Sequence, residues 1–94
     1  MNKNLIVKKL TEHQYNQVQA DGVASELMLI DTQLVPLLEK WIQNNIETDF
    51  SVEGFSLIEL MSLYNMSYPA ALLTIDWLIK EPETASFAIK KGIK

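Results

Sequence analysis

Apolar residues recur at helical spacing through the last two-thirds of the chain. Asp31 or Thr32 can cap the first of the helices that this spacing indicates, and Pro36 fits its first turn. The later helices have their own start signals: Ser56, Ser67 and Pro82. The pattern predicts four helices, over about 32–45, 56–65, 68–80 and 82–91.

The first 30 residues have a weaker pattern. Residues 4–10 (NLIVKKL) suit a short strand, Thr11 can open a helix that Asp21-Gly22 ends, and 26–30 (ELMLI) is open between strand and helix. We expect a strand–helix–strand or a loop–helix opening here. The predicted fold class is mainly α, a small helical bundle with short N-terminal strands as an option, in a single domain over 1–94.

The predicted helix over 68–80 is apolar around most of its circumference. Within 69–80 the polar residues are Thr74, Asp76 and Lys80. A helix of this kind is either the central helix of a bundle or half of an interface, and the sequence leaves both interpretations open. If the helix is the central one of the bundle, Trp41 and Trp77 are both expected to be buried in the core.

Composition narrows the class of protein. The 94 residues are 48% hydrophobic and 21% charged, which is typical of a globular chain. The chain has no cysteine, so it needs no oxidising compartment, and a cytoplasmic location is expected. The apolar run near the N-terminus is too short for a signal peptide, and no stretch is long enough to predict a membrane span.

The charge is unevenly distributed. The net charge is −4 and arginine is absent, while lysines gather at the two ends of the chain. Between residues 31 and 59 a single lysine, Lys40, stands against six acidic residues: Asp31, Glu39, Glu47, Asp49, Glu53 and Glu59. An acidic middle attracts basic protein surfaces and repels phosphate backbones, so we expect a protein partner and no nucleic acid.

The residues needed for common catalytic sites are missing. His13 is the one histidine, there is no cysteine, and the three glycines are far apart. These residues cannot form a catalytic triad, a typical zinc site or a glycine-rich phosphate loop. We therefore expect no enzymatic activity, no metal and no catalytic residue.

Residues 56–78 fit a helix-turn-helix frame, with a turn at Asn65 and caps at Ser56 and Ser67. In a DNA reader the second helix offers polar and basic side chains to the major groove. Here its sequence YPAALLTIDW contains no lysine or arginine. A DNA-binding regulator is therefore an alternative that the chemistry disfavours.

Two segments also resemble acyl and peptidyl carrier proteins. ETDFSVEGFSLIEL (47–60) is similar to the segment that delivers a serine to the second helix of that family, and KEPETASFA (80–88) to the start of its last helix. The resemblance implies a four-helix carrier with a phosphopantetheine arm on Ser56. The competing interpretation makes Ser56 the cap of a capping box with Glu59, beside a hydrophobic staple of Phe55 and Leu60.

Taken together, the sequence predicts a small, acidic, non-catalytic module that binds a protein partner or a second copy of itself. The helix over 69–80 and the acidic region over 47–59 are the expected binding surfaces. No membrane contact is expected, and no cofactor except phosphopantetheine under the carrier alternative. The residues expected to make the interaction are Glu47, Asp49, Glu53, Glu59, Leu73 and Trp77.

Overall fold

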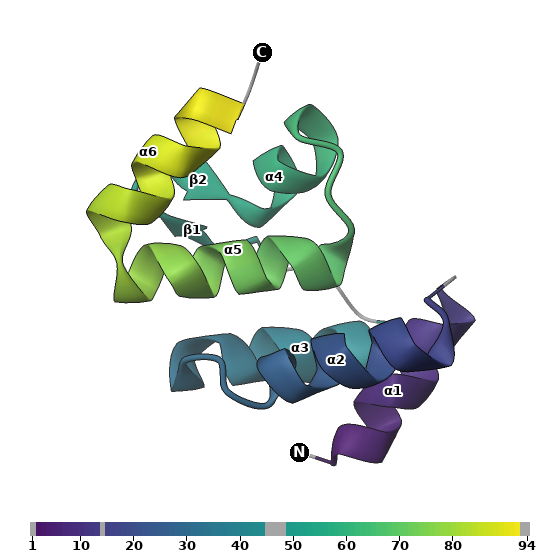
Figure 1. Cartoon of the computed structure of the whole chain (residues 1–94). Coiled ribbons are helices and arrows are strands. Elements are labelled where there is room, and N and C mark those ends of the chain that lie inside the picture. The colour runs from purple at the N-terminus through teal and green to yellow at the C-terminus, as the bar shows by residue number, and fades with distance from the viewer. Residues whose placement is uncertain (1, 14, 45–48, 93–94) are drawn as a thin grey trace. The chain divides into compact units, whose positions relative to one another are not determined.

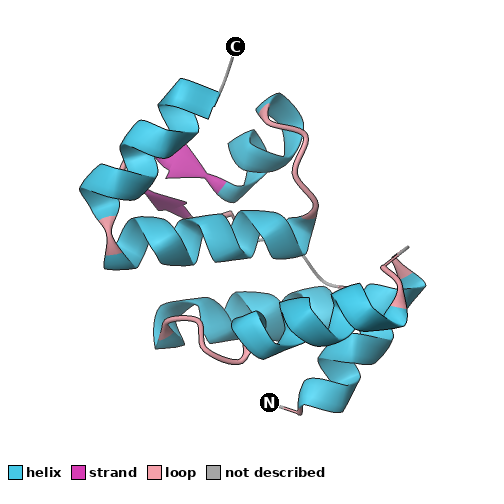
Figure 2. Cartoon of the chain, in the orientation of Figure 1, coloured by secondary structure: helices cyan, strands magenta, loops and turns pink. Residues whose placement is uncertain are grey.

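A computed structural model describes residues 2–13, 15–44 and 49–92. The described chain is mainly α-helical, as the sequence predicts, and includes one two-stranded antiparallel sheet (Figure 2). It divides into two compact units, Met1–Ile46 and Glu47–Lys94, which are treated separately below. The organisation of 1–94 as a single domain stays a prediction.

The described residues of the N-terminal unit form four helical elements (Figure 1). They are α1 (Lys3–Glu12), α2 (Gln17–Leu27), the 3-10 helix η1 (Thr32–Leu34) and α3 (Val35–Ile42). Helix α1 packs against both α2 and α3. Apolar side chains from every element are buried: Ile6, Leu10, Ala20, Ala24, Leu27, Leu34, Leu38 and Trp41.

The expected strand over 4–10 is wrong, because these residues form most of α1. Asn2 caps the helix, its side chain accepting a hydrogen bond from the Asn4 N–H at 2.8 Å. Ile6 and Leu10, four residues apart, are both fully buried, whereas Leu5 is 52% exposed. Burial thus follows a helical period, which a short run of branched apolar residues did not reveal.

The helix expected from Thr11 to Asp21-Gly22 is also wrong. Helix α2 begins only after Asn16, which forms a capping box with Gln19, and it continues through Gly22 to Leu27. A glycine inside a helix costs about 1 kcal/mol, and burial of one apolar face offsets that cost. The same helix ends inside the ELMLI segment, so no strand forms at 26–30.

The described residues of the C-terminal unit form the small sheet and three helices (Figure 1). Its elements are β1 (Ser51–Val52), β2 (Phe55–Ser56), α4 (Leu57–Leu63), α5 (Tyr68–Lys80) and α6 (Pro82–Gly92). Helix α5 contacts α4, α6 and β1. The buried apolar residues come from all three helices and from β2: Phe55, Leu57, Leu60, Tyr68, Ala71, Leu72, Ile75, Leu78, Ala85 and Ile89.

Residues 51–56 form a β-hairpin, which the sequence analysis did not predict. Val52 pairs with Phe55, and Ser51 with Ser56. The two turn residues between them, Glu53 and Gly54, both have a positive φ, of 53° and 82°. Two such residues define the tight turn that suits a hairpin, and glycine adopts this backbone conformation without strain.

The helix boundaries of this unit agree closely with the sequence predictions. Ser67 caps α5, its Oγ accepting a hydrogen bond from the Ala70 N–H at 3.3 Å, and Pro69 lies in the first turn. Pro82 opens α6, which has Glu83 in its first turn and basic residues in its last. These charges suit the dipole of α6.

Candidate functional site

The start of α4 is held by the loop and hairpin that precede it. The Leu57 N–H donates to the Phe50 carbonyl at 3.0 Å, and the Glu59 N–H donates to Ser56 Oγ at 3.1 Å. The Ile58 N–H between them donates to Asp49 Oδ1 at 3.2 Å, and the same oxygen accepts the Phe50 N–H at 2.8 Å. The first three N–H groups of α4, which the helix itself leaves unpaired, therefore all have partners.

Ser56 is the cap of α4, as the sequence predicts, and it is buried, with 8% of its surface exposed. The expected capping box is wrong in its second hydrogen bond, the one between the Glu59 side chain and the Ser56 N–H. The Glu59 carboxylate makes no hydrogen bond to the Ser56 N–H in the described part of the chain. Phe55 and Leu60, the expected staple, are both buried.

The acidic residues that were expected to bind a partner have different surroundings. Asp49, Glu53 and Glu59 are exposed, and Glu47 lies outside the described residues. Asp49 differs from the other two because its carboxylate accepts the Ile58 N–H in the first turn of α4. Glu53 lies in the hairpin turn and Glu59 in the first turn of α4, so these two carboxylates remain directed to solvent.

Two apolar residues on α4 are exposed, and the sequence analysis did not name them as candidates for an interaction surface. Ile58 is 60% exposed and Leu63 is 71% exposed. The helical period contained this signal, since Leu57 and Leu60 occupy the inner face and Ile58 is left to point outward. The exposed face of α4 therefore carries apolar side chains beside the Glu59 carboxylate.

Asp49 also affects Tyr68, the first residue of α5. The Tyr68 side chain is buried, with 6% of the residue exposed. Burial, together with the negative charge of Asp49, raises the pKa of the Tyr68 phenol above its ordinary value. One carboxylate therefore acts on the starts of two helices, α4 and α5.

Helix α5 is largely buried, but Trp77 is not. Seven of its thirteen residues are buried, and Leu73, another expected interaction residue, is half-buried. The expectation that both tryptophans are buried is confirmed for Trp41, which is 5% exposed, and is wrong for Trp77, which is 36% exposed. Trp77 is thus the large apolar residue that α5 presents to solvent.

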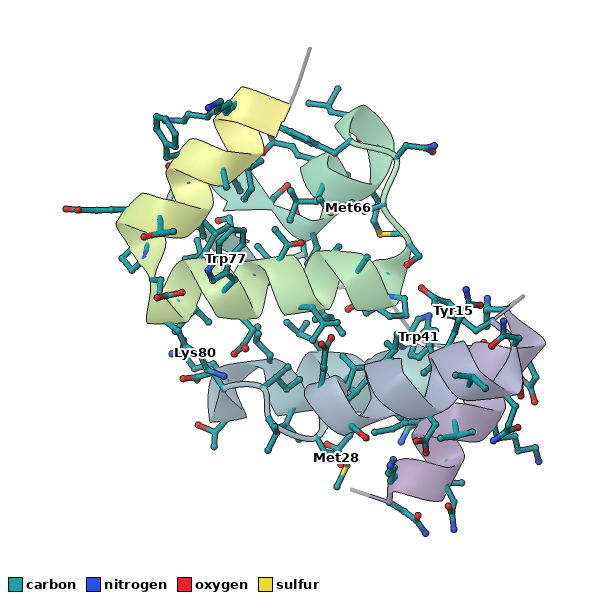
Figure 3. All side chains as sticks on the ribbon, viewed as in Figure 1. Tyr15, Met28, Trp41, Met66, Trp77 and Lys80 are labelled. Carbon is teal, nitrogen blue, oxygen red and sulfur yellow. The ribbon has the colours of Figure 1, made fainter. Side chains whose placement is uncertain are left out.

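Trp77 lines a cleft in the C-terminal unit with a volume of about 310 Å³. In Figure 3, Trp77 lies on the side of α5 that faces α6, and Met66 lies in the connection between α4 and α5. The cleft is lined mainly by aromatic, aliphatic and small residues: Tyr64, Met66, Thr74, Trp77, Ala88, Ile89 and Gly92. This lining is typical of a site that takes an apolar group.

The polar groups near Trp77 have defined partners. The Trp77 indole N–H donates to Glu81 Oε1 at 2.9 Å, which fixes the ring beside an exposed carboxylate. Thr74 Oγ1 donates to the Ala70 carbonyl at 2.8 Å. The Lys80 ammonium and the Asp76 carboxylate form an ion pair at 2.8 Å.

The helix-turn-helix frame exists as secondary structure, with α4 and α5 separated by residues 64–67. Asn65 adopts a φ of 56° in that connection, and the Met66 N–H donates to the Leu60 carbonyl at 3.2 Å. The basic residue of α5 is Lys80, which is paired with Asp76. The helix therefore lacks the row of exposed basic side chains that a DNA reader needs.

In the N-terminal unit, side chains gather around Trp41. The His13 ring lies 5.5 Å from the Trp41 ring, and Lys9 Nζ lies 5.7 Å from the Trp41 ring centroid. Lys9 Nζ also donates to Asn44 Oδ1. Within residues 2–13, 15–44 and 49–92, no group of three or more His, Cys, Asp or Glu residues is placed to hold a metal ion. The contact that His13 makes at the end of α1 is with the Trp41 ring, and not with a set of metal ligands.

Comparisons with protein families, with curated proteins and with solved structures find no match to this chain. In the part of the chain that the structure describes, none of the helices combines the length and the apolar character needed to cross a bilayer.

Proposed function

We propose that this protein is a small, non-catalytic module that binds another protein through the C-terminal unit. The cleft beside Trp77 takes an apolar portion of the partner. The acidic residues Glu53 and Glu59, with the exposed Ile58, attract and contact a basic partner surface. A chain without cysteine suits a reducing compartment, and we propose that the protein acts in the cytoplasm.

The observation that carries this proposal is the exposure of Trp77 within the cleft. Most other apolar residues of α5 are buried, so this tryptophan is an exception on its own helix. Tryptophan is among the residues that contribute most to protein interfaces, particularly where it lines a pocket. The cleft supports a protein partner because its lining offers apolar contact area and few polar groups for chemistry.

The carrier alternative depends on Ser56. A phosphopantetheine arm requires an accessible serine hydroxyl, whereas Ser56 is buried and its Oγ already accepts the Glu59 N–H. This arrangement favours the role of a cap. We therefore propose no cofactor for the protein.

A second copy of the chain is the alternative partner. In that case a complex forms without any other protein, and sedimentation velocity of the purified chain detects it as a concentration-dependent increase in mass. A chain that remains monomeric up to high micromolar concentration requires a different protein as partner.

The proposal is tested by affinity capture from the native host with quantitative mass spectrometry. The variant Ala88→Met places a larger side chain in the cleft, and Phe87→Ala alters the neighbouring residue of α6, which is 68% exposed and outside the cleft lining. We expect at least one protein to be captured by the wild type and by Phe87→Ala and to be lost with Ala88→Met. Equal capture by all three chains would contradict the proposal. Circular dichroism establishes that Ala88→Met remains folded.

A further inference from the structure

The cleft beside Trp77 has mainly apolar walls, and the Glu81 carboxylate, which is outside the lining, accepts a hydrogen bond from the Trp77 indole. Met66 and Ile89 contribute aliphatic surface, and Trp77 contributes an aromatic ring. The Glu81 carboxylate holds the indole N–H through Oε1, at 2.9 Å, and this acid is exposed. A group that suits all of these features has an apolar stem and a cationic head.

Lys80 on α5 and Lys91 on α6 each contact a group other than Glu81. Lys80 pairs with Asp76 at 2.8 Å. Lys91 Nζ lies 5.8 Å from the centroid of the Phe87 ring, and Phe87 is not part of the cleft lining. These two contacts are made with groups other than Glu81, and the exposed Glu81 carboxylate is open to a cation from a partner.

We propose that the cleft binds the side chain of an arginine from a partner protein. This inference rests on the proposed function and specifies what the partner presents. The aliphatic stem lies against Met66 and Ile89, and the guanidinium stacks on the Trp77 ring and donates hydrogen bonds to Glu81. A guanidinium is suited to both contacts because it is planar, weakly hydrated and able to donate two parallel hydrogen bonds to one carboxylate.

The size of the cleft agrees with a single side chain. A volume of about 310 Å³ is at the lower end of the range for ligand pockets, roughly 300 to 1,000 Å³, and it leaves room for one long side chain. The sequence also restricts the source of the ligand. Because the chain contains no arginine, a second copy cannot supply one, and the partner is a different protein.

The test is a nuclear magnetic resonance titration of the full chain with an acetylated and amidated Gly-Arg-Gly peptide. The protein has two indole N–H signals, and Trp41, which is buried in the other unit, serves as the internal control for Trp77. The variant Trp77→Phe assigns the signals. We expect a saturable shift of the Trp77 signal with the arginine peptide. The control peptide has citrulline in place of arginine, a side chain of nearly the same shape without the charge, and its affinity should be at least tenfold lower.

Two acidic variants separate a specific contact from general attraction. Glu81→Gln is expected to weaken binding of the arginine peptide about three- to fivefold, the scale of an exposed ion pair. Glu83→Gln removes an exposed acid two residues further on and is expected to leave the affinity unchanged. Equal shifts with the citrulline peptide, equal effects of the two variants, or the absence of a saturable shift at Trp77 would each overturn the inference.

These outcomes are distinct from failure of the proposed function. If Ala88→Met abolishes capture of a partner while the arginine peptide does not bind, the cleft is a protein-binding site for a different group. If neither experiment gives the expected result, both proposals are wrong.

Discussion

The carboxylate of Asp49 accepts a hydrogen bond from the Ile58 N–H, nine residues further along the chain, at 3.2 Å. The intervening hairpin, with its two-residue turn at Glu53 and Gly54, brings the two residues together. Asp49 thereby places a negative charge at the N-terminus of α4, where the helix dipole is stabilised by it. This acidic residue, expected to contact a partner, stabilises the fold as well.

Replacement of Asp49 is expected to destabilise the protein, by an amount that depends on whether the new side chain keeps an acceptor oxygen. Asp49→Ala removes the acceptor and should lower the free energy of unfolding by about 1 kcal/mol. Asp49→Asn keeps an acceptor oxygen but loses the charge, so about 0.3–1 kcal/mol is expected. Chemical denaturation measures both changes. Glu53→Ala, in the hairpin turn, should change stability by less than about 0.5 kcal/mol, and an equal effect at Asp49 and Glu53 would contradict the capping role.

The raised pKa of Tyr68 predicts a loss of stability in alkaline solution. A phenol whose pKa is higher in the folded state contributes stability that is complete below about pH 10, its unfolded pKa, and is lost as the pH rises through the folded pKa. Tyr68→Phe should therefore lose less stability than the wild type between about pH 9 and 12. Because the two chains share all lysines, comparing their denaturation curves isolates Tyr68. Parallel curves would contradict the assignment.

Asp49 contributes to that pKa, since its charge is the second cause after burial. Spectrophotometric titration of the tyrosines should therefore show a lower Tyr68 pKa in Asp49→Asn than in the wild type, with Tyr68→Phe identifying the signal. An unchanged titration curve would mean that burial alone shifts the phenol.

The serine that caps α4 and a serine within α4 should respond differently to replacement by alanine. Ser56→Ala removes the cap and should destabilise by about 1 kcal/mol. Ser62 is exposed in the middle of the helix and bonds back to the Ile58 carbonyl at 2.8 Å, so Ser62→Ala should be neutral or slightly stabilising. Thermal unfolding of the two variants makes the comparison.

The same variants test the carrier alternative. After incubation with coenzyme A and a broad-specificity phosphopantetheine transferase, the intact mass of the wild type is expected to be unchanged. A mass increase of one phosphopantetheine that disappears in Ser56→Ala and persists in Ser62→Ala would establish the carrier and contradict the cap-only role.

Two glycines should also respond in opposite directions. Gly22 lies inside α2, and a Cβ there meets nothing within 4 Å, so Gly22→Ala should stabilise by about 0.5–1 kcal/mol. Gly54 has a φ of 82°, which strains any L-residue, so Gly54→Ala should destabilise by about 1 kcal/mol. Stabilisation by both substitutions would contradict the hairpin turn.

The C-terminal helices could be predicted from sequence because their signals are local. Ser67 and Pro82 act on the residues directly beside them, so the start of α5 and of α6 needs no tertiary information. The prediction was wrong for the N-terminal 30 residues. There α1 and α2 are stabilised by packing against each other, which local sequence signals do not reveal. In addition, Gly22 lies inside α2, where a glycine suggests the end of a helix.

The hairpin and the candidate site were harder to predict. Glu53-Gly54 is a less typical turn pair than Asn-Gly, and each strand has only two residues, too few to display an alternating pattern. The exposure of Trp77 depends on where α6 and residues 64–66 lie against α5. Helical spacing identifies which residues share a face and gives no information on which neighbours cover that face.

The central claim is that the partner binds in the cleft beside Trp77. Nuclear magnetic resonance of the methionine methyl groups tests this claim most directly. Met66 lines the cleft, and Met28, which is 43% exposed in the other unit, is an internal control in the same spectrum. The protein captured from the native host is added to chain labelled with ¹³C at the methionine methyl groups. We predict that the Met66 signal shifts while the Met28 signal does not. A complex that forms with the Met66 signal unchanged would contradict the account.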